Sequence, residues 1–172
     1  MASADPDPED LKRTPLHDLH VALGGRMVGF AGYAMPVQFA GIIAEHAHTR
    51  SDAGLFDVSH MGQARVTGAG AAEALEALVP GDIAGLAPGR MRYTQLTNEA
   101  GGIVDDLMVT RTGDGFLLVV NAARKAVDFA LLGPALADRG CVLERLPDRA
   151  LIALQGPRAA EALAPLAPGA AD

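Results

Sequence analysis

The chain has 172 residues, a formal net charge of -7 at pH 7 and an apolar fraction of 49%. This length accommodates one domain with a proper core, or one domain and the start of another. The acidic balance provides no basic surface for nucleic acid, and no apolar run approaches the roughly 20 residues that cross a bilayer. Cys141 is the single cysteine, which excludes an internal disulfide and favours a reducing compartment, with the cytoplasm as the default location.

Residues 1–10 are acidic and rich in proline, and we expect them to form a flexible tail. From there, capping residues, apolar periodicity and glycine or proline stops predict the elements. In chain order they are a helix over 16–23, a strand over 27–33, a helix over 42–53, a strand over 63–67, a helix over 71–79, strands over 91–97, 103–110 and 116–121, a helix over 122–139 interrupted at Gly133-Pro134, strands over 142–146 and 150–154, and a helix over 157–163.

The strands over 91–121 are joined by short turns that contain glycine, which is typical of an antiparallel meander. Helices are interspersed with such hairpins along the chain. The sequence therefore predicts an α+β fold, an antiparallel sheet with flanking helices.

Two carboxylates interrupt the apolar run that follows Gly101-Gly102. Asp105 and Asp106 are neighbours in a predicted strand, so their side chains project from opposite faces of the sheet. This arrangement argues against a carboxyl pair sharing one proton between these two residues. One inward carboxylate remains, which either binds a cationic or N–H-bearing ligand, acts as a general base, caps a turn or pairs with a buried arginine.

The histidines and the cysteine give weaker signals. His17 and His20 are three residues apart and can share an ion, but no third or fourth ligand is evident nearby. Cys141 opens a predicted strand without a basic neighbour to lower its pKa, so packing is the simpler interpretation. We expect no metal site.

An ordered series of motifs resembles the aminomethyltransferase (T protein) family of the glycine cleavage system. The resemblance covers residues 11–164, and its specificity lies in the order of the motifs. They are Thr14-Pro15-Leu16, the segment 30–38 with Phe-Ala-Gly-Tyr and Met-Pro-Val-Gln, the segment 53–62 with Ala-Gly-Leu-Phe-Asp-Val-Ser-His-Met-Gly, the segment 101–107, Val119-Val120-Asn121, and Leu154-Gln155-Gly156-Pro157.

The resemblance implies a folate-binding domain of a transferase. Such an enzyme takes an aminomethyl group from the lipoyl arm of H protein, transfers the one-carbon unit to tetrahydrofolate and releases ammonia. By the same resemblance Asp105 is the catalytic carboxylate, and it also contacts the folate. The other residues that would line the pterin side of the folate pocket are Met61, Tyr93, Val119 and Asn121.

The sequence departs from the family in two respects. After Asn121 the family usually has a longer polar stretch with an acidic residue before the helix, whereas this chain has Ala122 to Asp128. Members of the family are also considerably longer. We therefore expect an N-terminal portion, with a further domain starting near residue 148 and a truncated end at 165–172. The alternative is an accessory protein that binds folate and transfers nothing. A third possibility is that this chain is inert by itself.

Overall fold

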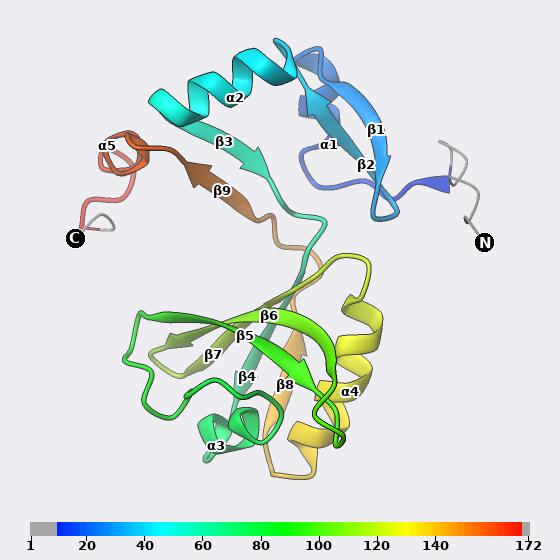
Figure 1. The fold of residues 1–172 in the computed structure, drawn as a ribbon, viewed down its shortest axis with the longest axis vertical. Coiled ribbons are helices and arrows are strands. Elements are labelled where there is room, and N and C mark those ends of the chain that lie inside the picture. Colours follow the sequence, from blue (N-terminus) through cyan, green and yellow to red (C-terminus); the bar gives the residue numbers. More distant parts are fainter. Residues whose placement is uncertain (1–9, 170–172) are drawn as a thin grey trace. The chain divides into compact units, whose positions relative to one another are not determined.

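A computed structural model describes residues 10–169 and divides the chain into two compact units, whose elements are labelled in Figure 1. Unit 1 contains residues 1–60 and 150–172, and unit 2 contains residues 61–149. Unit 2 is therefore inserted into the sequence of unit 1. The sequence analysis expected one domain over 11–164 with a new start near 148, and the later boundary between the units falls at residues 149 and 150.

The expected terminal segments lie largely beyond the described residues. Only Asp10 of the expected tail at 1–10 is described, and the expected truncated end at 165–172 is described as far as residue 169. In the part of the chain between those limits, no helix is long and apolar enough to cross a membrane.

Unit 1 pairs its strands in two separate antiparallel ladders, β1 with β2 and β3 with β9. Short helices flank these ladders. The described elements of unit 1 are α1 (His17–Ala22), β1 (Arg26–Phe30), β2 (Tyr33–Gln38), α2 (Ile42–Ser51), β3 (Gly54–Asp57), β9 (Ile152–Gln155) and α5 (Ala159–Leu163).

A two-residue turn joins β1 to β2. Ala31 and Gly32 both have positive φ, 49° and 80°, as a type I′ turn requires, and such turns match the twist of paired strands. The strand predicted over 27–33 was therefore wrong at its end, because β1 stops at Phe30 and a second strand begins at Tyr33. Pro36 is tolerated because β2 belongs to a two-stranded ladder and lies beside a shift in its register.

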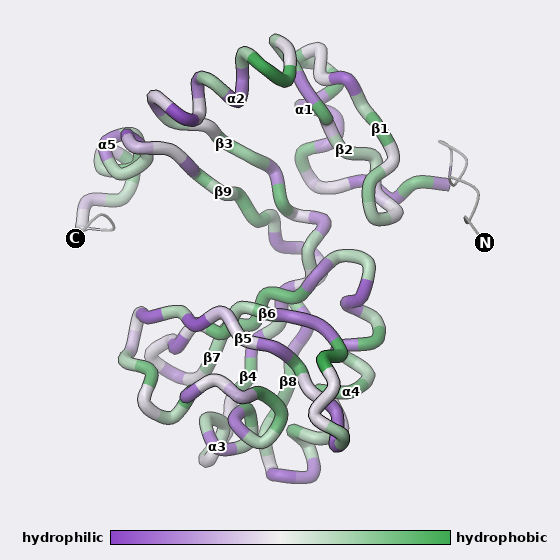
Figure 2. The backbone as a smooth tube through the Cα atoms, in the orientation of Figure 1, coloured by the Kyte–Doolittle hydropathy of each residue, from purple (hydrophilic) through white to green (hydrophobic). Residues whose placement is uncertain are grey.

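The second ladder of unit 1 joins segments that are far apart in the sequence. Leu55 of β3 opposes Leu154 of β9, and Figure 2 shows the two strands side by side with hydrophobic stretches in green. Beyond β3, Val58 N–H donates to the carbonyl of Leu151, and the Ser59 hydroxyl accepts from Leu151 N–H. These contacts extend the pairing between the two sequence segments of unit 1 beyond the ladder.

Unit 2 is a five-stranded sheet of order β5-β6-β7-β4-β8 with antiparallel neighbours throughout (Figure 1). Helix α4 packs against β8 and α3. The elements of unit 2 are β4 (Gly62–Thr67), α3 (Ala71–Glu76), β5 (Met91–Thr97), β6 (Ile103–Thr112), β7 (Gly115–Val120), α4 (Lys125–Ala137) and β8 (Val142–Arg145).

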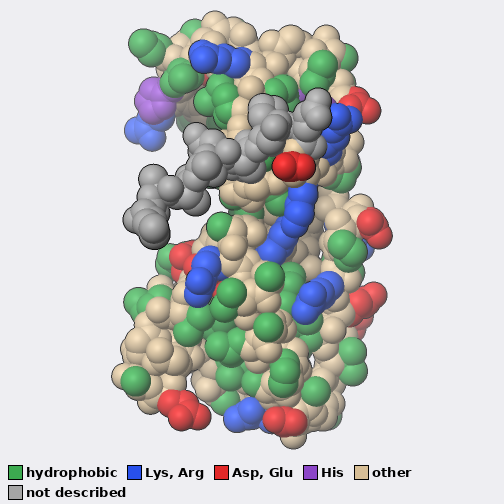
Figure 3. All heavy atoms as spheres, turned by 90° about the vertical axis from the view of Figure 1, so that its right-hand side faces the viewer, with side chains coloured by type: hydrophobic (Ala, Val, Ile, Leu, Met, Phe, Trp, Pro, Cys, Tyr) green, Lys and Arg blue, Asp and Glu red, His purple; other side chains and the backbone are tan. Residues whose placement is uncertain are grey.

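The main core lies between the sheet of unit 2 and its helices. Each fully buried leucine or valine there contributes roughly 1.5–3 kcal/mol through removal from water. The core residues whose exposure is 0% are Ala64, Val66, Leu75, Ile83, Val109, Leu118, Leu132 and Leu136. Other hydrophobic side chains remain at the surface, and Figure 3 shows them in green among lysine and arginine side chains.

The structure confirms the α+β fold with antiparallel sheets and flanking helices. The meander over 91–121 is confirmed as β5, β6 and β7. The expected interruption at Gly133-Pro134 was wrong, because α4 continues through Pro134. A proline leaves the carbonyl four residues earlier without its helical donor, and here that residue, Ala130, is exposed to water.

Candidate active site

Asp105 lies near the start of β6, directly after an ordered hairpin. Gly101 has a φ of 77°, and the Asn98 side-chain oxygen accepts from the backbone N–H groups of Ala100 and Gly102. Beyond this turn the ladder is irregular, since Leu96 opposes Asp105 while Thr97 opposes Ile103. The extra residue on β6 is a bulge, a device that redirects side chains at functional sites.

The strand register assigns Asp105 and Asp106 to opposite faces of the sheet. Asp105 opposes Leu96, which is buried in the core, whereas Asp106 opposes the partly exposed Gln95. This agrees with the alternation that the sequence predicts. In the described part of the chain, Asp105 forms no ion pair with an arginine.

Asn121 holds one oxygen of the Asp105 carboxylate. Its Nδ2 donates to Asp105 Oδ1 at 3.1 Å and to the backbone carbonyl of Asp106 at 3.3 Å. Asn121 follows β7 directly, so a residue at the end of β7 fixes a side chain on the neighbouring strand β6. Asp105 Oδ2 is buried and has no hydrogen-bond partner within residues 10–169. An anchored carboxylate with one unused oxygen can accept a proton or stabilise a cation.

Asp128 is a second buried carboxyl at this site, and the sequence analysis did not identify it as a site residue. It lies on α4 with 1% of its surface exposed. Burial raises the pKa of Asp128 to about 7, and the charge of Asp105 and its side-chain contact contribute to the same effect. A signal was present in the sequence, because Asp128 precedes the buried Leu132 and Leu136 at four-residue spacing on the apolar stripe of the helix.

The other expected folate residues form a separate group. Tyr93 opposes Met108, and Met108 opposes Val119, so the three lie in one row across β5, β6 and β7. This row shares the sheet face of Asp106, two residues from Met108. Tyr93 is exposed and Val119 is buried. Met61 is half-buried and directly precedes Gly62, the partner of Val120. The structure thus brings Asn121 to Asp105, and it places Tyr93 and Val119 on either side of Met108.

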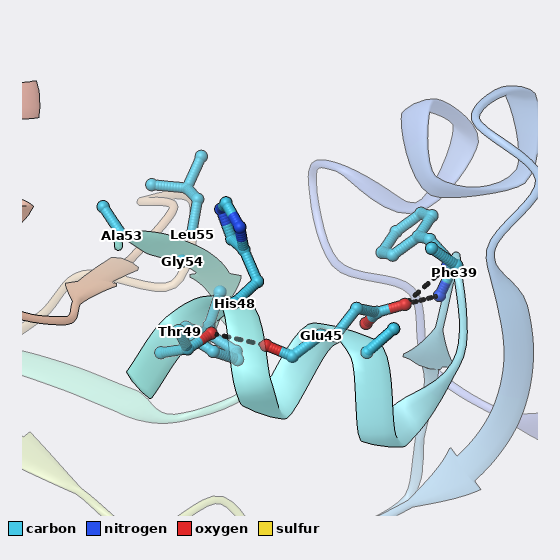
Figure 4. A pocket seen from close by; sticks show the side chains of 10 residues that line it. Phe39, Glu45, His48, Thr49, Ala53, Gly54 and Leu55 are labelled. Carbon is cyan, nitrogen blue, oxygen red and sulfur yellow. Dashed lines mark hydrogen bonds between the residues drawn. The ribbon is translucent and has the colours of Figure 1, made fainter. Parts of the chain in front are cut away.

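A separate cavity of about 530 Å³ lies in unit 1, between α2 and β3. Figure 4 shows Phe39, His48, Leu55 and their neighbours around it. Glu45 Oε1 accepts from the backbone N–H groups of Phe39, Ala40 and Gly41, and these bonds lower the pKa of Glu45. Glu45 therefore orders the entry into α2, and none of the five expected site residues lines this cavity.

The histidines do not gather into a cation site. His20 Nε2 and Thr14 Oγ1 both donate to Asp57 Oδ2, at 2.8 and 2.7 Å, and His17 contacts Asp18. Within the described residues, no three side chains of His, Cys, Asp or Glu lie close enough together to bind a metal ion.

Comparisons with known proteins identify close relatives. The family model described as "GCVT N-terminal domain" matches residues 16–172. An aminomethyltransferase of Deinococcus deserti is 48% identical over 157 residues, which cover 90% of this chain and 44% of that protein. The human mitochondrial aminomethyltransferase is 48% identical over 162 residues, covering 90% of this chain and 40% of that protein.

A solved structure of an aminomethyltransferase is also similar to this chain. The crystal structure of glycine cleavage system aminomethyltransferase T from Bartonella henselae matches with a TM-score of 0.85 and 44% identity. The match covers 90% of this chain and 43% of that one. The chain thus spans less than half the length of each of these relatives.

Proposed function

Because this chain belongs to the GCVT N-terminal domain family, we propose that it carries the catalytic carboxylate of a tetrahydrofolate-dependent aminomethyltransferase of the glycine cleavage system. The observation that carries the proposal is the state of Asp105. One of its oxygens is fixed by Asn121, and the other is buried without a partner in the described residues. A carboxylate held in this way is prepared for a ligand that brings an N–H group or a positive charge.

The proposed reaction moves one carbon between two carriers. The C–S bond between the methylene carbon and a sulfur of the dihydrolipoyl arm of H protein breaks, as does the bond from that carbon to nitrogen. Two C–N bonds form, to N5 and N10 of tetrahydrofolate. N5 and N10 of tetrahydrofolate each lose a proton, of which one protonates the released sulfur and the other the departing nitrogen. The products are 5,10-methylenetetrahydrofolate, ammonia and an H protein whose arm carries two thiols.

Asp105 supplies the charge and the proton acceptor in this scheme. A positively charged iminium develops on the one-carbon unit as ammonia leaves, and a nearby carboxylate in a water-poor site stabilises that cation strongly. The same carboxylate accepts a proton from a folate amine as the new C–N bond forms. Neither role requires a metal ion.

We assign the pterin contacts to the four other expected residues. Tyr93 and Met61 would offer an aromatic face and a polarizable side chain to the flat ring. Val119 would provide an apolar wall. Asn121 would offer its side-chain carbonyl oxygen as an acceptor, since its Nδ2 donates to Asp105 and to Asp106. Lipoylated H protein is the proposed partner. We propose a cytoplasmic location on the basis of the single cysteine, although the name of the human relative includes the word mitochondrial.

Single-turnover transfer from aminomethyl-loaded H protein to tetrahydrofolate tests the function. We expect Asp105→Asn to reduce the rate by about 10²–10⁴-fold, the usual contribution of a positioned acid or base. Asp106→Asn is the matched control, because it removes the neighbouring charge from the other face of β6. Equal rates for wild type and Asp105→Asn would refute the assignment. Folate binding without transfer in the wild type would favour an accessory folate-binding protein instead.

A further inference from the structure

Two side chains of unit 2 carry three buried carboxyl oxygens for which the described residues supply no hydrogen-bond donor. Both oxygens of Asp128 and Oδ2 of Asp105 are inaccessible to water and have no hydrogen-bond partner in the described part of the chain. The two side chains are in contact with each other. An ionised carboxylate accepts hydrogen bonds but donates none. Two ionised carboxylates side by side therefore cannot form a hydrogen bond with each other.

A single proton on one of the two carboxyl groups allows them to form a hydrogen bond. Two adjacent carboxylates repel each other, whereas a carboxylic acid donates its O–H to the neighbouring carboxylate and satisfies an oxygen on each side. The more deeply placed group is the natural holder of the proton, because burial penalises the charged form. Asp128 is 1% exposed, and Asp105 already accepts from the amide of Asn121.

The geometry points to Asp128 as a positioning residue for Asp105: its carboxyl O–H donates to the Asp105 carboxylate and, with Asn121, holds that carboxylate in one orientation. A carboxylate oxygen accepts through two lone pairs, so this bond leaves a second acceptor position for the ligand. This inference rests on the proposed function, in which Asp105 is the reacting carboxylate. The alternation along β6 argues against a proton shared between Asp105 and Asp106, and the pair that shares one is formed with Asp128 of α4 instead.

The surrounding charges agree with a proton on Asp128 below neutral pH. Burial, the charge and contact of Asp105, and the more distant charge of Asp106 all raise the pKa of Asp128, and the guanidinium of Arg124 opposes them. The resulting pKa is about 7. Titration of Asp128 therefore introduces a second negative charge beside Asp105 as the pH rises through neutrality.

Carboxyl ¹³C NMR of the labelled chain, recorded from about pH 4 to 9, tests this arrangement directly. Wild type should show an aspartate that titrates near pH 7, and Asp128→Asn should lack that transition. In Asp105→Asn the midpoint should move down, because the neighbouring charge is gone. Asp138→Asn, an exposed change at the end of the same helix, should leave the transition unchanged.

The side-chain amide of Asn121 reports on the positioning role. Its NH₂ resonances should shift with the same midpoint in wild type and stay constant in Asp128→Asn, a response that a merely structural Asp128 would not produce. A neutral transition that survives Asp128→Asn, or one that ignores Asp105→Asn, would overturn the inference. Neither readout uses folate or H protein, so failure here is distinguishable from failure of the proposed transfer.

Discussion

Asn121 and Asp105 are joined by a 3.1 Å hydrogen bond from Nδ2 to Oδ1. The bond connects the end of β7 to the start of β6, and the same Nδ2 also reaches the Asp106 carbonyl. Asn121 therefore fixes both the side chain of Asp105, the proposed catalytic residue, and the backbone carbonyl of Asp106. The residue expected to contact the pterin is also the one that orients the carboxylate.

Replacing Asn121 should impair the proposed transfer in a graded way. Asn121→Ala removes a hydrogen bond to a charged group, worth about 1.5–3 kcal/mol, so we expect a loss of about tenfold or more in the single-turnover rate. Asn121→Asp should be worse, because it adds a like charge beside Asp105. Rates measured for both variants, with folding checked by circular dichroism, decide the order. If the Asp variant matched wild type, this orienting role would be wrong.

The stability of the protein should fall as the pH rises from about 4 to 7. The folded-state pKa of Asp128, about 7, lies above the ordinary value of 3.8, so the folded chain retains a proton that the unfolded chain has released. The resulting penalty is complete above pH 7 and on the order of 2–4 kcal/mol. Asp128→Asn should remove it, which urea unfolding at a series of pH values will measure. Asp138→Asn should retain the wild-type slope.

Unit 1 should show the opposite response, through Asp57. Burial alone would raise the pKa of this carboxyl, but hydrogen bonds from Ser59, His20 and Thr14 outweigh it and hold the pKa below its usual value. The stabilisation is therefore present at neutral pH and is lost as the pH falls through the folded-state pKa.

Asp57→Asn should accordingly lower the stability of unit 1 by about 1–3 kcal/mol at pH 7, and by less under acidic conditions. Hydrogen exchange at the amides of β3 and β9 reports this change locally. Asp52→Asn breaks an exposed pair with Arg158 and should alter exchange by less than about 1 kcal/mol. Equal effects of the two substitutions would contradict the role given to Asp57.

Gly62 should not tolerate a side chain. A Cβ at this position would lie 2.7 Å from Val120 Cγ2 and 2.9 Å from Lys125 Cβ, so Gly62→Ala has to displace the start of α4. Overpacking of this kind costs about 1–3 kcal/mol. Gly113→Ala is the matched control, since nothing lies within 4 Å of its added carbon. Thermal unfolding of the two variants compares them, and an unchanged Gly62→Ala would show that α4 shifts freely.

Local signals explain which elements the sequence predicts. Strands β5, β6 and β7 follow one another through short glycine turns, and each finds its partner next to it in the chain. Strand β3 was missed because its partner, β9, follows only after the whole of unit 2. Strand β2 was missed because Pro36 is a poor strand residue outside an edge position.

The candidate site is likewise predictable from the sequence only in part. Asp105 is conspicuous in the sequence, since a charge in an apolar strand requires a reason. Asp128 is 23 positions later in the chain, and its contact with Asp105 depends on how α4 packs onto the sheet, which periodicity alone does not give. The separation of Tyr93 and Val119 from Asp105 likewise depends on the register of β5, β6 and β7, in which both residues oppose Met108, on the other face from Asp105. These are tertiary contacts, which secondary-structure propensity and residue spacing do not predict.

The pairing of β3 with β9 also fixes an order of events during synthesis. The ribosome synthesises β3 before unit 2, and it synthesises residues 152–155 of β9 only after the whole of unit 2. The inserted unit thus has all its strands available while β3 still presents unpaired backbone groups. Unit 2 of a nascent chain can therefore fold before the β3–β9 ladder of unit 1 forms, although unit 1 begins earlier in the sequence.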